Sequence, residues 1–233
     1  MVERLTLKGE KETWYPNSIN TLEFHLSVLL KSNEYFSSDQ IYPMRKNLAY
    51  SLQYVQFLSQ ILRDVSLSSV LRTQNIKSSV VHGAAVIEAI FNYLVISNGF
   101  GNKTQWKKVN KHCSHEYTLA ATKYKNDIEV FEKLEVPIPT QMTFDQLAKK
   151  VESKKLLGNA FTEYSKIKPI RQLRNKIHIH DSDHSSDTDW NNFNQSEFIL
   201  ISGILYKVLT SEIFSSSTHM DKFEYLNTAN NQM

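Results

Sequence analysis

The residues of this sequence that are best suited to chemistry gather in one short stretch, residues 170–184. Its fifteen positions hold two arginines, three histidines, one asparagine and two aspartates. Histidine, with an unperturbed pKa of ~6.5, can take or give a proton near neutral pH. Arginine stays cationic and can hold phosphate oxygens through two parallel hydrogen bonds. Together these side chains suit metal-free cleavage of an RNA phosphodiester, in which a base removes the 2′-hydroxyl proton and cations stabilise the charged phosphorane.

A helix from about residue 159 to 179 is predicted to position these groups. At ~100° per residue, Arg171, Arg174 and His178 fall on one stripe of this helix. His180 points away from the stripe unless the helix unwinds near its end, where an aspartate-rich loop begins. We therefore predict that Arg171 and Arg174 bind phosphate. We predict His178 as the main acid/base residue, with His180 as the alternative.

Two other interpretations of this stretch stay open. In the first, the arginines pair with Glu88 or other acids and the histidines are surface residues, so the stretch is structural. In the second, imidazole and carboxylate groups bind zinc or another transition metal. The residues that offer such ligands are His178, His180, Asp181, Asp183 and His184. The adjacent arginines disfavour a dication, so we predict no metal and no cofactor.

The elements around this stretch are predicted to be helices. Only 6 glycines and 5 prolines occur in 233 residues, well below ordinary usage, and this favours long helices over turn-rich β-structure. Apolar residues at three- and four-residue spacing predict the helices. Besides the helix at 159–179, one helix is predicted to begin after a cap at Asn17-Ser18. Four others are predicted to span about 39–64, 79–97, 143–154 and 195–214. Thr143 and Gln146 form a capping box at the start of the helix at 143–154.

The sequence thus predicts an all-α fold, an up-and-down bundle of four or five main helices. We expect a leader over residues 1–16, a single helical domain over 17–215 and a flexible tail over 216–233. Residues 101–140 are expected to form an irregular insertion in that domain.

The helix at 79–97 is apolar nearly all round and should be central in the fold. Glu88 interrupts it, and an unpaired buried carboxylate is costly, so Glu88 needs a partner. It either makes a structural hydrogen bond to a neighbouring helix or orients an arginine or histidine across the bundle.

A second candidate binding surface lies in residues 103–125, where six lysines are interleaved with aromatic residues. Lysine and aromatic side chains can bind RNA through phosphate contacts and base stacking. The RNA-binding candidates are Lys107, Lys108 and Lys111. A solvated surface with inward-facing aromatics is the alternative. His112, Cys113 and His115 are close enough in sequence to suggest a metal site, but no second Cys/His pair supports a zinc finger.

The composition indicates in which cellular compartment the protein is expected. Cys113 is the one cysteine, which excludes an intramolecular disulfide and fits a reducing compartment. No secretory signal and no apolar run near membrane-spanning length is evident, so we expect a cytoplasmic protein with no membrane association. A net charge of +3 is too small to indicate nucleic-acid binding by itself.

The segment from Leu173 to His178, Leu-Arg-Asn-Lys-Ile-His, resembles the signature of the HEPN superfamily. These helical domains are widespread in bacterial toxins, abortive-infection proteins and CRISPR-linked ribonucleases. Their signature is an arginine, often followed by a polar residue, and then a histidine after four to six intervening residues. Both Arg171 to His178 and Arg174 to His180 fit this range. The resemblance covers roughly residues 40–215 and includes the apolar helix with Glu88.

The resemblance implies a metal-independent endoribonuclease that leaves 2′,3′-cyclic phosphate ends. It implies a homodimer whose two motifs line one cleft, with Asn175 positioning the helix or the RNA and Glu88 in support. It also implies a toxin or phage-defence setting, with an antitoxin or defence protein as a partner. The alternatives are a non-catalytic HEPN-like dimerisation module that binds RNA, nucleotide or a partner protein, and a purely structural helical protein.

Overall fold

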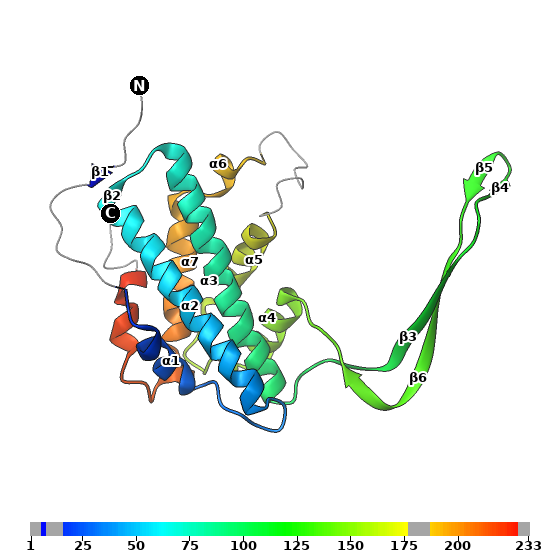
Figure 1. The fold of residues 1–233 in the computed structure, drawn as a ribbon, viewed down its shortest axis with the longest axis horizontal. Coiled ribbons are helices and arrows are strands. Elements are labelled where there is room, and N and C mark those ends of the chain that lie inside the picture. The colour runs from blue at the N-terminus through cyan, green and yellow to red at the C-terminus, as the bar shows by residue number, and fades with distance from the viewer. Residues whose placement is uncertain (1–5, 8–15, 177–186, 228–233) are drawn as a thin grey trace. The chain divides into compact units, whose positions relative to one another are not determined.

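The computed structural model describes residues 6–7, 16–176 and 187–227. Contacts between residues divide the chain into two compact units (Figure 1). The first, here called the helical unit, comprises Met1–Gly99 and Thr143–Met233. The second, here called the ribbon, comprises Phe100–Met142 and is inserted between two helices of the first.

The helical unit contains two long helices and several shorter ones. The α-helices are α1 (Ile19–Ser27), α2 (Ser38–Asp64), α3 (Ser69–Ser97), α4 (Phe144–Ser153), α5 (Ile167–Asn175), α6 (Asp189–Asn192) and α7 (Gln195–Leu209). The 3-10 helices are η1 (Glu163–Lys166), η2 (Glu212–Phe214) and η3 (Met220–Leu226). Strand β1 (Thr6–Leu7) pairs antiparallel with β2 (Val65–Ser66). Figure 1 shows α2 and α3 lying side by side.

Helix α3 forms the centre of the helical unit, as its apolar sequence predicts. It contacts α2, α4, α5, α6 and α7, and Ile87 and Phe91 are fully buried. Gly83 lets α7 approach closely, because an added Cβ would lie 2.7 Å from Ile201 Cγ1. Within the described residues, α3 is the one helix long and apolar enough to cross a membrane, and 61% of its most apolar window is buried in the fold. Such burial is typical of a core helix.

The predicted helix starts are partly confirmed. Thr143 and Gln146 form the expected capping box at α4, with Gln146 N donating to Thr143 Oγ1 (3.3 Å) and Thr143 N donating to Gln146 Oε1 (2.9 Å). Helix α3 begins at Ser69, earlier than predicted, because Ser68 caps it and Ile76 adds a buried turn before the apolar run.

The expected tail also differs from the structure, which packs part of it into the core. Phe223 and Leu226 of η3 are fully buried. His25 of α1 connects this segment to the N-terminal part of the unit. Its ring is fully buried, its Nδ1 lies 2.7 Å from Ser217 Oγ, and it stacks on Phe214 with centroids 4.4 Å apart. The aromatic residues after position 213 therefore complete the core.

The ribbon overturns the prediction of an all-α fold. Strand β3 (Lys103–Cys113) pairs antiparallel with β6 (Asp127–Pro139), and β4 (Tyr117–Leu119) pairs antiparallel with β5 (Thr122–Tyr124). The protein is therefore mixed α and β, and the expected irregular insertion is an antiparallel hairpin whose long strands pair with two register shifts, between Thr104 and Trp106 and between Lys108 and Asn110. The signal for it is alternation of apolar and polar residues in two stretches of β6, on either side of Phe131–Lys133, a period-2 pattern typical of strands. The apolar members are Ile128, Val130, Leu134, Val136 and Ile138.

The ribbon turns at two alanines, which explains why a low glycine count did not reveal it. Ala120 and Ala121 have φ values of 48° and 65° and connect Leu119 to Thr122 as a two-residue loop. Positive φ at both central residues defines a type I′ turn, which favours Asn-Gly. An L-residue with a Cβ pays roughly 1–2 kcal/mol in this region.

Replacing Ala120 by Asn and Ala121 by Gly is expected to stabilise the ribbon tip by about 1 kcal/mol, because both new residues adopt positive φ at lower cost. Amide hydrogen exchange at Thr122–Tyr124 should slow by roughly fivefold, since opening becomes rarer. Ala120→Val serves as the control and should speed exchange, because a β-branched residue is disfavoured at positive φ. Equal exchange in all three proteins would contradict the assigned turn.

Candidate arginine site on α5

Helix α5 holds its two arginines against acidic residues of two other helices. Arg174 Nη2 donates to Glu88 Oε2 of α3 at 3.2 Å. Arg171 Nη1 lies 2.8 Å from Asp145 Oδ1 of α4. Ile167 and Ile170 of α5 are buried and pack the helix against the core, which limits where its two guanidinium groups can lie.

The Arg174–Glu88 pair is neither fully buried nor fully exposed. The Arg174 side chain is 41% exposed and the Glu88 side chain 26% exposed. The structure thus supplies the partner that Glu88 needs. A guanidinium carries five N–H donors, so Arg174 can keep this hydrogen bond and still donate to a phosphate. The pair fits both interpretations of Glu88, since a structural bond across the bundle also orients the arginine.

Asp145 is a site residue that the sequence reasoning missed. It is the acidic residue in the first turn of α4, between Thr143 and Gln146 of the capping box. A hydrogen bond from Lys149, and next the charge of Arg171, hold the pKa of Asp145 below its usual value. Asp145 therefore stays ionised and anchors Arg171 beside the start of α4.

The histidines of the motif are not placed by the structure. Helix α5 ends at Asn175, which is exposed. His178 and His180 lie outside the described residues, as do Asp181, Asp183 and His184. Their roles, and the shared stripe of Arg171, Arg174 and His178, stay predictions.

The described residues on either side of the histidine segment contact each other. Lys176 Nζ lies 2.8 Å from Asp187 Oδ1 and 2.9 Å from Asn192 Oδ1. The last described residue before the histidine segment is thus tied by its side chain to the first described residue after it. Neither the lysine nor its partners were singled out from the sequence.

The lysines predicted to bind RNA face acidic residues across the ribbon. Lys108 pairs with Glu129, Lys111 Nζ lies 2.8 Å from Asp127 Oδ2, and Lys107 stands opposite Glu132 in the strand register. The hydrogen bond from Lys111, followed by one from Cys113, lowers the pKa of Asp127 to about 2. Since β6 largely offsets the charge of β3, these lysines attract phosphate less than their spacing in sequence suggests. Their contact with RNA stays a prediction.

The candidate metal ligands of the ribbon are not gathered. Nowhere in residues 6–7, 16–176 and 187–227 do three His, Cys, Asp or Glu side chains come together as metal ligands would. His112 Nε2 instead lies 3.2 Å from Asn110 Nδ2. Cys113 is exposed, with its strand partner Asp127 beside it.

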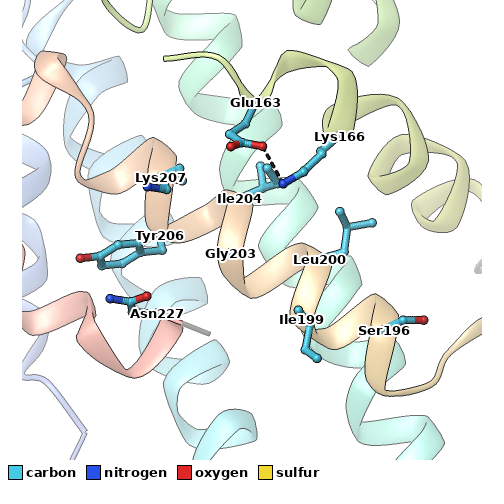
Figure 2. A pocket seen from close by; sticks show the side chains of 10 residues that line it. All are labelled: Glu163, Lys166, Ser196, Ile199, Leu200, Gly203, Ile204, Tyr206, Lys207 and Asn227. Carbon is cyan, nitrogen blue, oxygen red and sulfur yellow. Dashed lines mark ion pairs between the residues drawn. The ribbon is translucent and has the colours of Figure 1, made fainter. Parts of the chain in front are cut away.

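A pocket of about 430 Å³ lies along α7 and is lined also by two residues of η1 (Figure 2). An ion pair between Lys166 Nζ and Glu163 Oε2 (2.7 Å) borders it. Its remaining lining residues are Ser196, Ile199, Leu200, Gly203, Ile204, Tyr206, Lys207 and Asn227. Neither Arg171, Arg174 nor Glu88 contributes to it, so this hollow is separate from the candidate site.

No protein-family model matches the chain, and no curated protein or solved structure matches it either. The class of protein must therefore be argued from its own residues.

Proposed function

We propose that this protein is a metal-independent endoribonuclease with its active centre at the C-terminal end of α5. The Arg174–Glu88 contact is the observation that supports this best. It holds a guanidinium in a defined position, leaves 41% of that side chain exposed, and lies four residues before His178 in sequence. The resemblance of this stretch to the HEPN signature, whose spacing Arg171–His178 and Arg174–His180 fit, supports the same reaction and a toxin or phage-defence role.

The proposed reaction assigns one role to each group. His178, or His180 in its place, takes the proton from the ribose 2′-hydroxyl. The 2′-oxygen attacks phosphorus, the bond from phosphorus to the 5′-oxygen breaks, and the departing oxygen takes up a proton. Arg174 and Arg171 stabilise the added negative charge on the phosphorane. The products are a 2′,3′-cyclic phosphate and a 5′-hydroxyl.

One structural observation favours a second candidate, a non-catalytic helical module that binds RNA or nucleotide. Both arginines form ion pairs with acidic residues of other helices, as arginines that stabilise a fold commonly do. In this alternative the arginines stabilise the helical unit and bind phosphate, but they do not catalyse cleavage. We place it second because Arg174 keeps a substantial exposed surface.

The purified full-length protein is expected to cleave a labelled RNA in excess EDTA. The 5′ fragments should carry 2′,3′-cyclic phosphate, shown by resistance to phosphatase until acid opens the ring. His115→Ala, a change on the ribbon, is the matched control and should cleave normally. RNA binding without cleavage would select the non-catalytic module. Loss of cleavage with EDTA and its return with a divalent metal would overturn the metal-independent mechanism.

A further inference from the structure

Another pocket of the helical unit, here called the α6 pocket, is lined by the first turns of α3 and by residues 190–195, which run from α6 into α7. Its volume is about 400 Å³, within the usual range of small-ligand sites. The proposed reaction gives it no role. Its lining residues are Ser69, Arg72, Thr73, Ile76, Trp190, Asn191, Phe193, Asn194 and Gln195.

The wall of this pocket that α6 provides is fixed to α3. Gln74 Nε2 and Lys77 Nζ of α3 both donate to the carboxylate of Asp189, each at 2.8 Å. Phe193, directly after α6, is fully buried, and Lys77 Nζ lies 5.5 Å from the centroid of its ring. Figure 1 shows α6 near the N-terminal end of α3. Although α6 is short, these contacts hold Trp190 beside α3.

Arg72 gives the α6 pocket its charge. It is the one charged residue among the nine that line the pocket, all of which belong to the described part of the chain. Its Nη2 donates to Gln195 Oε1. Because a guanidinium carries five N–H donors, Arg72 can keep this bond and still bind an anion such as phosphate.

Trp190 gives the pocket an aromatic surface. It is 61% exposed, so a large apolar ring stands in water at the pocket. An exposed indole beside a guanidinium is the combination with which proteins bind single-stranded nucleic acid, because a base stacks on the ring while the cation binds phosphate.

Amide side chains supply hydrogen-bonding groups for the edge of a base. Asn194 Oδ1 accepts from Ser196 N at 2.9 Å, and Gln195 Oε1 accepts from Arg72. These bonds use only the amide oxygens, so the NH₂ groups of Asn194 and Gln195 can donate to ring nitrogens of a base. Six of the nine lining residues are polar, which disfavours a purely apolar ligand.

The α6 pocket lies next to the end of α5, where the proposed active centre is. Asn192, between the lining residues Asn191 and Phe193, has its Oδ1 2.9 Å from Lys176 Nζ. Lys176 directly follows α5 and is two residues after Arg174. A single RNA strand can therefore contact both the pocket and the arginine site.

We propose that the α6 pocket binds one unpaired purine nucleotide of the RNA substrate, with its base on Trp190 and a neighbouring phosphate on Arg72. A base inside a duplex is covered on both faces and cannot stack on Trp190, so the pocket selects single-stranded RNA. A purine has the larger ring system and stacks more strongly. The inference takes RNA as its ligand from the proposed function, but it concerns binding and not cleavage.

The test measures binding of the full-length protein to a short labelled oligoadenylate with 2′-O-methyl riboses. This probe lacks the 2′-hydroxyl nucleophile, so it can be bound but not cleaved. Trp190→Ala should raise the dissociation constant roughly five- to a hundredfold, the usual cost of losing one stacked base. Trp190→Phe keeps an aromatic ring and should retain most of the affinity. Tyr50→Ala removes an exposed aromatic residue of α2 that does not line the pocket, and this control should bind as the wild type does.

The salt dependence of binding tests Arg72 separately. Arg72→Ala should make the slope of log affinity against log salt concentration less steep by about 0.7, the contribution of one phosphate contact on a single strand. Arg72→Lys and Trp190→Ala should both keep the wild-type slope. Oligouridylate of the same chemistry should bind the wild type more weakly than oligoadenylate, and Trp190→Ala should reduce that difference.

Unchanged affinity in Trp190→Ala, or an unchanged salt slope in Arg72→Ala, would overturn the α6 pocket as a nucleotide site. A wild-type protein that does not bind the probe would overturn it as well. Cleavage of unmodified RNA by a protein with either result would leave the proposed function standing. Binding that depends on Trp190 and Arg72, without cleavage of unmodified RNA, would overturn the proposed catalysis and leave the pocket standing.

Discussion

His178→Ala and Arg174→Ala are each expected to lower the rate of RNA cleavage by about 10²–10⁴-fold, the usual cost of losing a group that acts in the transition state. The double variant should be little slower than either single variant, because residues that act as one unit lose their effects non-additively. The measurement is the single-turnover rate on labelled RNA, with the free energy of unfolding determined for each protein.

His180→Ala decides which histidine acts. A slow His180→Ala protein beside an active His178→Ala protein would move the acid/base role two residues along the chain. Normal cleavage by all of these variants, each folded, would contradict the assignment. Variants that unfold would instead support the structural interpretation of the arginines and histidines.

Glu88→Gln separates positioning from structural stabilisation at the same site. If Glu88 acts by orienting Arg174, the variant should cleave more slowly, and adding Arg174→Ala should slow it little further. A purely structural bond would lower the melting temperature of Glu88→Gln and leave the rate of the folded fraction unchanged.

Acid is expected to destabilise the protein through His25. Burial, and to a lesser extent the charge of His219, lowers the pKa of His25 from 6.5 to about 4, against a hydrogen bond with the Leu209 backbone that raises it. Below pH 6.5 the unfolded chain binds a proton that the folded protein excludes until about pH 4. As the pH is lowered from 6.5 to about 4, the free energy of unfolding should therefore decrease by on the order of 3 kcal/mol in total. Above pH 6.5 the free energy of unfolding should not depend on the protonation of His25.

Urea unfolding of the wild type and of His25→Gln between pH 4 and pH 7.5 measures this effect. Glutamine can keep a hydrogen bond to Ser217 and does not titrate in this range. The difference in free energy of unfolding between the two proteins should shrink as the pH falls. A constant difference across the range would show that His25 is not the buried neutral group described here.

The helical part of the fold was predictable because its signals are local. Regular apolar spacing and the Thr143–Gln146 capping box act within a few residues, and both α2 and α4 follow them. The first turns of α3 are less apolar, so only its N-cap at Ser68 marked where it begins. The ribbon was missed because glycine and proline counts average over the whole chain, and its turn uses Ala120 and Ala121 instead.

The arginine site was predictable only in part. The free-energy cost of burying an unpaired carboxylate predicts a partner for Glu88. Which residue is that partner depends on how α3 and α5 pack, and the sequence does not give this packing. The pairing of Arg171 with Asp145 likewise joins two helices that sequence spacing does not relate. In the ribbon, the acids that offset the lysines lie on the returning strand. Charge counted along a window of sequence therefore overstated the positive potential.

The base of the ribbon has a consequence for how this protein can evolve. Thr140 N donates to Asn102 O at 2.9 Å, so the chain enters and leaves the ribbon at one hydrogen-bonded pair. An insertion with such neighbouring ends can be lengthened, shortened or exchanged without altering the spacing of the helices that flank it. Lineages that share the helical unit can thus diverge in the ribbon while keeping the arginine pairs of α5 intact. Substitutions in the ribbon can then be selected independently of substitutions in the helical unit.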